Sequence, residues 1–351
     1  MLGCSVALMP LARANGQPEG RPGALATEAK RVVAAAGSEI GVRGAASGWW
    51  FLRGELEHLA EGFFWEGDLE ETTVTGADPV PVIARYAEEL DALGVRLVLC
   101  PVPAKAAIYP EKLASELATD AGGPAFGTLA PLAPFIDKLV EAGVEVIDLE
   151  PVFRELRSSS EEALYCAQDS HWSPLACRLA AGILADLVRD EPYVDLAREA
   201  FEEEILCADG DALRIYGDLL SEKERQSESM EELAVSYVGT GSGRPPQPLE
   251  ISPESPVLVV GDSHTLVFNE GADLGMHAHG AGLVDHLAAE LGFPVDREAS
   301  KGSGGDSARA NVARRSRSEE DLWNKKKVVF WVFSAREFSR GKWRPIPANV
   351  D

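Results

Sequence analysis

Basic residues, cysteines and long apolar runs are all scarce in this sequence, and each scarcity excludes a class of protein. Lysine and arginine number 33 among 351 residues, against 57 acidic residues, which gives a formal net charge of -24. Such a chain would repel nucleic acid and anionic membranes, so neither is expected as a partner. No apolar run approaches the roughly 20 residues that span a bilayer, so we expect a protein that does not cross a membrane.

The five cysteines show no spacing of a known metal site. Neither Cys-x-x-Cys nor a Cys/His ligand pattern is present, which argues against structural zinc, and we expect no cofactor. One disulfide among Cys166, Cys177 and Cys207 is the alternative to buried free thiols. The sequence alone does not decide between these two states.

The first 24 residues differ in composition from the rest of the chain. Residues 1–16 contain an apolar stretch and Ala12-Arg13-Ala14, which is typical of the end of a signal peptide, but they lack a basic start. A signal for export and a disordered tail are both interpretations of this segment. Residues 15–24 are rich in glycine and proline and predict a linker. We therefore expect residues 25–351 to form a single domain.

Helical and strand patterns alternate through most of that domain. A helix is predicted over 79–93 and a strand over 95–102, followed by a second pair over 129–142 and 144–149. Repeated alternation predicts an α/β fold with a mostly parallel central sheet and helices on both faces. The acidic, polar residues around 190–240 predict a helical excursion over the surface.

A serine follows a predicted buried strand. The apolar run Val257 to Val260 leads directly into Gly261-Asp262-Ser263. Ligands in open α/β sheets gather at the carboxyl ends of such strands, which is where Ser263 would lie. Gly261 permits a sharp turn, and the N–H of Ser263 or His264 at a helix start can donate to an oxyanion. A simple helix N-cap is the alternative interpretation of the same residues.

An aspartate and a histidine stand two residues apart in Asp169-Ser170-His171. In an extended segment both side chains point the same way, so Asp169 can hold His171 through Nδ1 while Nε2 faces a substrate. Ser173 and Pro174 then predict the N-cap and first position of a helix. A capping aspartate and a structural histidine are the alternative. Together with Ser263, the pair favours a hydroxyl–imidazole–carboxylate relay.

Several segments between about residues 45 and 345 carry a family resemblance. In chain order they are Gly48 to Gly54, Val102 to Ala106 with Tyr109-Pro110, Asp169 to Trp172, Gly261 to His264, Gly304-Gly305, and Val329 to Arg336. Together they resemble the alginate O-acetyltransferase AlgX/AlgJ group of the SGNH hydrolase-like superfamily. In this group the Asp-x-His motif precedes the serine, as it does here.

The resemblance implies an SGNH-like fold and a ping-pong transfer of an acetyl group. Ser263, deprotonated by His171 with Asp169 fixing the imidazole, would take the acetyl group and pass it to a hydroxyl of an exported polysaccharide. The N–H groups of Ser263 and of the Gly304-Gly305 turn would hold the oxyanion. Arg336 would orient the substrate, with a surface salt bridge as its alternative role.

The resemblance also implies a periplasmic or cell-envelope location and an acetyl donor supplied by a membrane-bound O-acyltransferase. His264, directly after the serine, either competes for its proton or binds substrate. Trp172, Trp343 and the segment 297–344, with 13 basic against 6 acidic residues, are the candidates for polymer binding.

Three other functions stay open. An esterase of the same fold would give the acetyl group to water, since access of water to the acyl-enzyme decides the outcome. A non-catalytic polysaccharide-binding component of an envelope complex is the second. The third is a metal site, because six potential ligands lie within 25 residues, namely Asp262, His264, Asp273, His277, His279 and His286.

Overall fold

A computed structural model describes residues 23–73, 76–118 and 132–349 of the chain. The expected export signal and most of the expected linker lie outside these ranges. Within the described part, no helix is both long and apolar enough to cross a bilayer. Cys166, Cys177 and Cys207 carry free thiols, so the disulfide considered among them is not formed.

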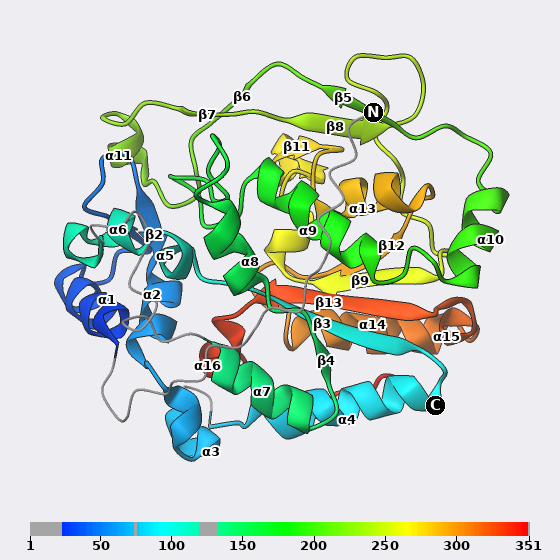
Figure 1. The fold of residues 1–351 in the computed structure, drawn as a ribbon, viewed down its shortest axis with the longest axis horizontal. Coiled ribbons are helices and arrows are strands. Elements are labelled where there is room, and N and C mark those ends of the chain that lie inside the picture. Colours follow the sequence, from blue (N-terminus) through cyan, green and yellow to red (C-terminus); the bar gives the residue numbers. More distant parts are fainter. Residues whose placement is uncertain (1–22, 74–75, 119–131, 350–351) are drawn as a thin grey trace.

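A five-stranded, wholly parallel sheet forms the centre of the fold (Figure 1). This confirms the predicted parallel sheet. Its spatial order is β12-β9-β13-β3-β4, so β13 lies in the middle. The strands are β3 (Arg96–Val102), β4 (Glu145–Val146), β9 (Val257–Gly261), β12 (Asp296–Ala299) and β13 (Val328–Ser334).

Helices cover both faces of this sheet, as the alternating pattern predicted. In Figure 1 they form one layer above the strands and one below. The first layer holds α8 (Leu149–Leu156), α9 (Pro174–Asp186) and α13 (Leu283–Leu291). The second holds α4 (Pro79–Ala92), α7 (Ala133–Glu141), α14 (Ser307–Ser318), α15 (Leu322–Lys325) and α16 (Glu337–Arg340).

The central strand β13 shows why its sequence is apolar throughout. Successive side chains of a strand point to opposite faces of the sheet. Phe330 and Val332 therefore join the core of one layer, while Trp331 and Phe333 join the other. Because both faces are covered, every residue of the strand is buried.

Smaller elements pack beside the sheet. β1 pairs antiparallel with β2, and β10 pairs with β11. In chain order these elements are α1 (Ala24–Ala35), β1 (Gly41–Arg43), β2 (Trp50–Leu52), α2 (Arg53–Ala60), η1 (Phe64–Glu66), α3 (Leu69–Thr72), α5 (Lys105–Ile108), α6 (Pro110–Leu113), η2 (Ser115–Leu117), α12 (Ser263–Leu266), β10 (Glu270–Gly271), η4 (Ala272–Leu274) and β11 (Met276–His279).

The helical excursion predicted around 190–240 is wrong beyond its first part. The segment holds α10 (Pro192–Ala200), then the antiparallel pairs β5 (Leu206–Asp209) with β8 (Ser236–Gly239) and β6 (Leu213–Ile215) with β7 (Glu231–Leu233), with α11 (Glu222–Arg225) between. In β6 and β7 an exposed charged residue stands next to a buried apolar one, Arg214 before Ile215 and Glu232 before Leu233. That two-residue alternation is the strand signal, and the high charge density concealed it.

Candidate active site

Three neighbouring strand ends bring the candidate residues together. Ser263 follows β9, Arg336 follows β13 and Lys105 follows β3. Because these strands are parallel and adjacent, their carboxyl ends meet at one edge of the sheet, where open α/β sheets bind ligands. Asp262 Oδ2 accepts a hydrogen bond of 2.8 Å from the Ser334 N–H, which ties the ends of β9 and β13 together.

Asp169 and His171 form a buried hydrogen-bonded pair. Asp169 Oδ1 accepts from the His171 N–H at 3.1 Å and lies 2.6 Å from His171 Nδ1. Their exposures are 0% and 5%. An ionised carboxylate only accepts, so the proton belongs on Nδ1 and Nε2 is left as a base. His171 Nε2 is buried without a hydrogen-bond partner among the described residues, an arrangement that costs about 1–3 kcal/mol unless a ligand or reaction uses it.

Two further donors hold the second oxygen of Asp169. Asp169 Oδ2 accepts from the Asp218 N–H at 2.9 Å and lies 2.9 Å from His277 Nε2. His277 has φ of 68°, a strained conformation for a residue other than glycine. From the sequence, His277 is a candidate only for the metal cluster, and no pattern there predicts this contact with Asp169.

The electrostatics suit a proton acceptor. Burial alone would raise the pKa of Asp169, but His171 and His277 outweigh it and hold that pKa well below its usual range. Burial would likewise lower the pKa of His171, but the charge and hydrogen bond of Asp169 outweigh it, and the pKa is raised. The carboxylate therefore stays ionised and stabilises an imidazolium beside it.

Lys105 fixes the backbone that carries this pair. Its Nζ is fully buried and donates to the carbonyl oxygens of Asp169 at 2.6 Å, Cys166 at 2.8 Å and Trp50 at 2.6 Å. Burial lowers the pKa of this ammonium group, although Glu55 and other acidic groups act the other way. A lysine inside an otherwise apolar segment was visible in the sequence, but no role had been attached to it.

The segment of the candidate nucleophile repeats the same local geometry. Asp262 Oδ1 accepts from the His264 N–H at 2.8 Å and lies 3.0 Å from His264 Nδ1. Asp262 and His264 are 0% and 1% exposed. The rings of His171 and His264 are 5.1 Å apart and meet at 65°. Trp172 links the two segments further, because its Nε1 donates to the His264 carbonyl at 3.0 Å.

Ser263 lies between Asp262 and His264 at the start of α12 and is 8% exposed. No hydrogen bond joins its Oγ to His171 Nε2 in the described structure. Long or unformed hydrogen bonds between nucleophile and base are common before a substrate binds. Asp262 caps α12, so the N-cap interpretation of this residue is confirmed. The cap and the placement of Ser263 at a strand end coexist.

The glycine turn predicted to hold an oxyanion packs against the same segment. A Cβ on Gly304 would lie 2.5 Å from Phe333 Cβ and 3.1 Å from the Asp262 nitrogen, so no larger residue fits there. The Gly305 N–H bonds to the Glu337 carboxylate, whose pKa is raised to about 7, first by burial and then by nearby Asp262. Of the two glycines, Gly304 is the one that packs directly against Asp262.

Arg336 lies inside the site and not in a surface ion pair. Its side chain is 15% exposed, and Nη1 is 3.8 Å from the buried Glu55 Oε1. Burial would raise the pKa of Asp262, but His264 and, less strongly, Arg336 keep it low. The guanidinium therefore contributes positive charge beside the residue that precedes Ser263.

The expected polymer-binding groups are mostly buried. Trp172 and Trp343 are 0% and 3% exposed, so the expectation that their rings bind a polymer is wrong. Both indoles fill the layers that support the site, where their N–H groups find carbonyl partners. Part of the basic C-terminal segment also serves the interior, since Lys326 and Arg315 both bind the buried Asp296.

Two groups of potential metal ligands can be compared in the structure: the cluster suggested by the sequence, and a second group around Asp169. The suggested cluster is not assembled, because His277 contacts Asp169 and His279 pairs with the exposed Asp273 at 3.6 Å. Ligand atoms of Asp169, His171 and Asp218 do lie within 4.8 Å of one another. Asp169 Oδ1 and His171 Nδ1 already bond to each other, however, so this donor set fits a hydrogen-bonded relay better than an ion.

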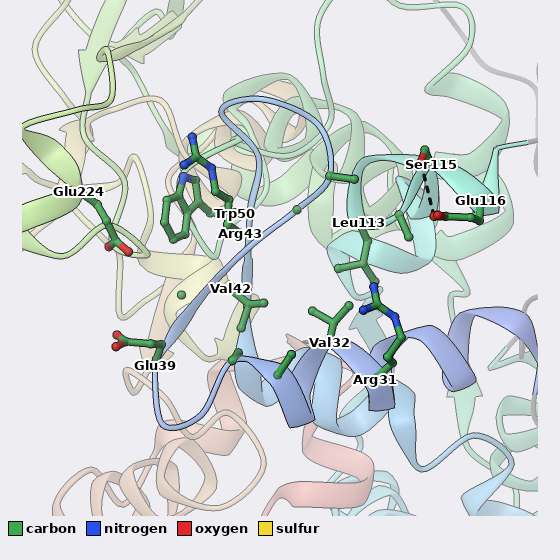
Figure 2. A pocket seen from close by; sticks show the side chains of 16 residues that line it. Arg31, Val32, Glu39, Val42, Arg43, Trp50, Leu113, Ser115, Glu116 and Glu224 are labelled. Atoms are coloured by element: carbon green, nitrogen blue, oxygen red, sulfur yellow. Dashed lines mark hydrogen bonds between the residues drawn. The ribbon is translucent and has the colours of Figure 1, made fainter.

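A cavity of about 550 Å³ lies apart from these residues, beside α1 and β1 (Figure 2). Arg31 and Val32 of α1, Val42 of β1 and Leu113 of α6 line it. Its lining includes none of the relay residues. Trp50 also lines it. The Trp50 N–H donates to the Ala167 carbonyl, and Lys105 Nζ donates to the carbonyls of both Trp50 and Asp169, so these bonds connect this wall to the Asp169 segment.

Most of the chain matches one family model. Residues 42–335 match the model of the SGNH hydrolase-like domain of acetyltransferase AlgX. The probable alginate O-acetylase AlgJ of Pseudomonas aeruginosa is 31% identical over 133 residues, which are 38% of this chain and 31% of AlgJ. The alginate biosynthesis protein AlgX of the same organism is 28% identical over 138 residues, 38% of this chain and 28% of AlgX. The matches thus span under a third of the length of these curated relatives.

Two solved structures share the fold. The O-acetyltransferase domain of Pseudomonas putida AlgJ superposes with a TM-score of 0.57 at 19% identity, covering 85% of this chain and 92% of that domain. Pseudomonas aeruginosa AlgX gives a TM-score of 0.55 at 20% identity, covering 84% of this chain and 62% of AlgX. These likenesses confirm the predicted SGNH-like α/β fold.

Proposed function

The chain belongs to the SGNH hydrolase-like acetyltransferase family of AlgX, and from this premise we propose that it transfers acetyl groups to hydroxyls of an exported polysaccharide. The observation that carries the proposal is the buried, hydrogen-bonded pair of Asp169 and His171, in which His171 Nε2 has no partner among the described residues. The His171 ring lies 5.1 Å from the ring of His264, which directly follows Ser263 in the chain. The Asp169–His171 pair and the segment that carries Ser263 are thus neighbours, and Asp169, His171 and Ser263 are all buried.

In the first half-reaction, Ser263 Oγ attacks the acyl carbon of the donor while its proton passes to His171 Nε2. Asp169 keeps the imidazole in the required tautomer and stabilises the imidazolium. The oxyanion accepts hydrogen bonds from the N–H groups of Ser263 and Gly304. The bond to the leaving oxygen then breaks, that oxygen takes the proton from Nε2, and an acetyl ester of Ser263 remains.

In the second half-reaction, a sugar hydroxyl attacks this ester and Ser263 is regenerated. Transfer prevails over hydrolysis when the bound acceptor keeps water from the ester, and Ser263 is only 8% exposed before an acceptor binds. The location we propose is the periplasm or cell envelope. The donor we propose is an acetyl group handed over by a membrane-bound O-acyltransferase.

The test compares wild-type protein with Ser263→Ala, using an aryl acetate as donor and oligosaccharides of uronic acid or neutral sugars as acceptors. We expect acetylated oligosaccharide from the wild type and none from Ser263→Ala. Ser316→Ala is the matched control, since its buried hydroxyl donates to the Ala313 carbonyl within α14. If the rate of acetate release is the same with and without acceptor, the protein is an esterase. Glycan binding without any acyl transfer would make it a binding component.

A further inference from the structure

His264 and Asp262 form a second carboxylate–imidazole pair. Asp262-Ser263-His264 repeats the sequence Asp-Ser-His of residues 169–171, and in both segments one carboxylate oxygen accepts from the histidine N–H and lies against Nδ1. The Nδ1 contact is 2.6 Å in one segment and 3.0 Å in the other. Both imidazoles therefore carry the proton on Nδ1 and leave Nε2 as a base.

The helix cap at Asp262 does not need the imidazole of His264. The cap is made by the backbone N–H of His264, and Thr265 adds a hydroxyl bond to the Asp262 carbonyl. The contact through Nδ1 adds nothing to the cap, but it fixes the orientation of the ring. His264 Nε2 is left buried and without a partner among the described residues, as His171 Nε2 is. Buried polar atoms are normally satisfied, so two such nitrogens in contacting rings call for a shared purpose.

Surrounding groups also hold the His264 ring in place. Trp172 meets it edge-on at 5.6 Å and donates to its backbone carbonyl. Asp262 is fixed in turn, because its second oxygen accepts from the Ser334 N–H at the end of β13. Each imidazole has its own aspartate, and the pKa values of Asp169 and Asp262 are both held below their usual range, so a carboxylate stands beside each ring.

We propose that His264 is a second catalytic base, which serves the incoming sugar hydroxyl while His171 serves Ser263; this inference rests on the proposed acyl transfer. In the second half-reaction, His264 Nε2 takes the proton of the sugar hydroxyl as its oxygen bonds to the acyl carbon. The bond from that carbon to Ser263 Oγ then breaks, and Nε2 returns the proton to Oγ. No proton or electron pair is left over.

The experiment separates the two half-reactions in His264→Asn. The asparagine amide can keep the donor contact to Asp262 that Nδ1 makes, while Nε2 is lost. Acetylation of Ser263 by an aryl acetate is followed by rapid quench and mass spectrometry, and discharge of the ester is followed separately with an oligosaccharide or with water alone. His286→Asn, at a buried histidine of α13 that belongs to neither carboxylate–imidazole pair, is the control for loss of a buried imidazole.

We expect His264→Asn to be acetylated within about threefold of the wild-type rate and to discharge the ester about 100-fold more slowly, a typical effect of removing one general base. His171→Asn should fail at acetylation itself. Equal slowing of both steps in His264→Asn, or no slowing of discharge, would overturn the inference. A wild-type ester that only water discharges would overturn the proposed transfer instead, and the water-discharge rates would still decide the role of His264.

Discussion

Replacement of Asp169 by asparagine tests the orienting role of this carboxylate. Four donors converge on its two oxygens: the His171 N–H and Nδ1 on one, and the Asp218 N–H and His277 Nε2 on the other. An asparagine amide has one oxygen and one NH₂ group. One of the two pairs of donors must therefore face the NH₂ group, which is itself a donor. If the NH₂ faces His171, Nδ1 must become the acceptor, Nε2 then carries the proton, and His171 is no longer a base.

The size of the effect follows from this geometry. One backbone N–H is left facing an NH₂ group in either orientation, which should cost about 1–3 kcal/mol of folding free energy. Activity should suffer more, because a wrong tautomer in a serine–histidine–aspartate relay lowers kcat about 10⁴-fold. That factor corresponds to about 5 kcal/mol of transition-state stabilisation.

The assay is acetyl transfer from an aryl acetate, with urea unfolding measured on the same preparations. Asp273→Asn is the control, since this aspartate also pairs with a histidine but has a side chain that is 78% exposed. We expect the kcat of the control to stay within about twofold of wild type, because an exposed ion pair contributes little free energy. A kcat of Asp169→Asn within threefold of wild type, in folded protein, would refute the orienting role.

Three other predictions concern the same region. Because the pKa of His171 is raised above its ordinary 6.5 and the base must be unprotonated, kcat/KM should rise with pH through a value above 6.5; a profile already flat at pH 6 would contradict this. In Gly217→Ala the new Cβ would lie 2.0 Å from a carbonyl oxygen and 2.5 Å from the Asp169 nitrogen, so transfer should fall about tenfold or more. The control is Gly182→Ala in α9, where the new Cβ meets open space. This variant should have a free energy of unfolding about 0.5–1 kcal/mol higher than the wild type. Lys105→Met removes the donor from three buried carbonyls and should cost about 3 kcal/mol or more in urea unfolding.

The parts of the fold that the sequence predicted are those with a local signal. The apolar run Val257 to Val260 predicted a buried strand, and β9 lies there with every residue buried. Ser173 and Pro174 begin α9 as their types predict. Strand β12 escaped detection because Asp296 begins it, and only the distant Arg315 and Lys326 make this charge tolerable inside the sheet.

In the site, too, the contacts that could be predicted are those with a local signal in the sequence. The Asp-x-His spacing predicts the Asp169–His171 contact because both residues lie in one short segment. His277 reaches the same carboxylate from 108 residues away in sequence, through a strained backbone that no local pattern reveals. The burial of Trp172 was equally invisible, since an indole beside a catalytic motif can serve a polymer or a core, and only the packing of α8 and α9 around it decides.

The central claim is that Ser263 carries the acetyl group. The most direct measurement is brief exposure to an acetyl donor, acid quench, proteolysis and mass spectrometry of the peptides. We predict the mass of one acetyl group on the peptide that contains Ser263, its absence in Ser263→Ala, and its loss when acceptor is added. An acetyl group on another residue, or acetyl transfer that persists in Ser263→Ala, would contradict the account.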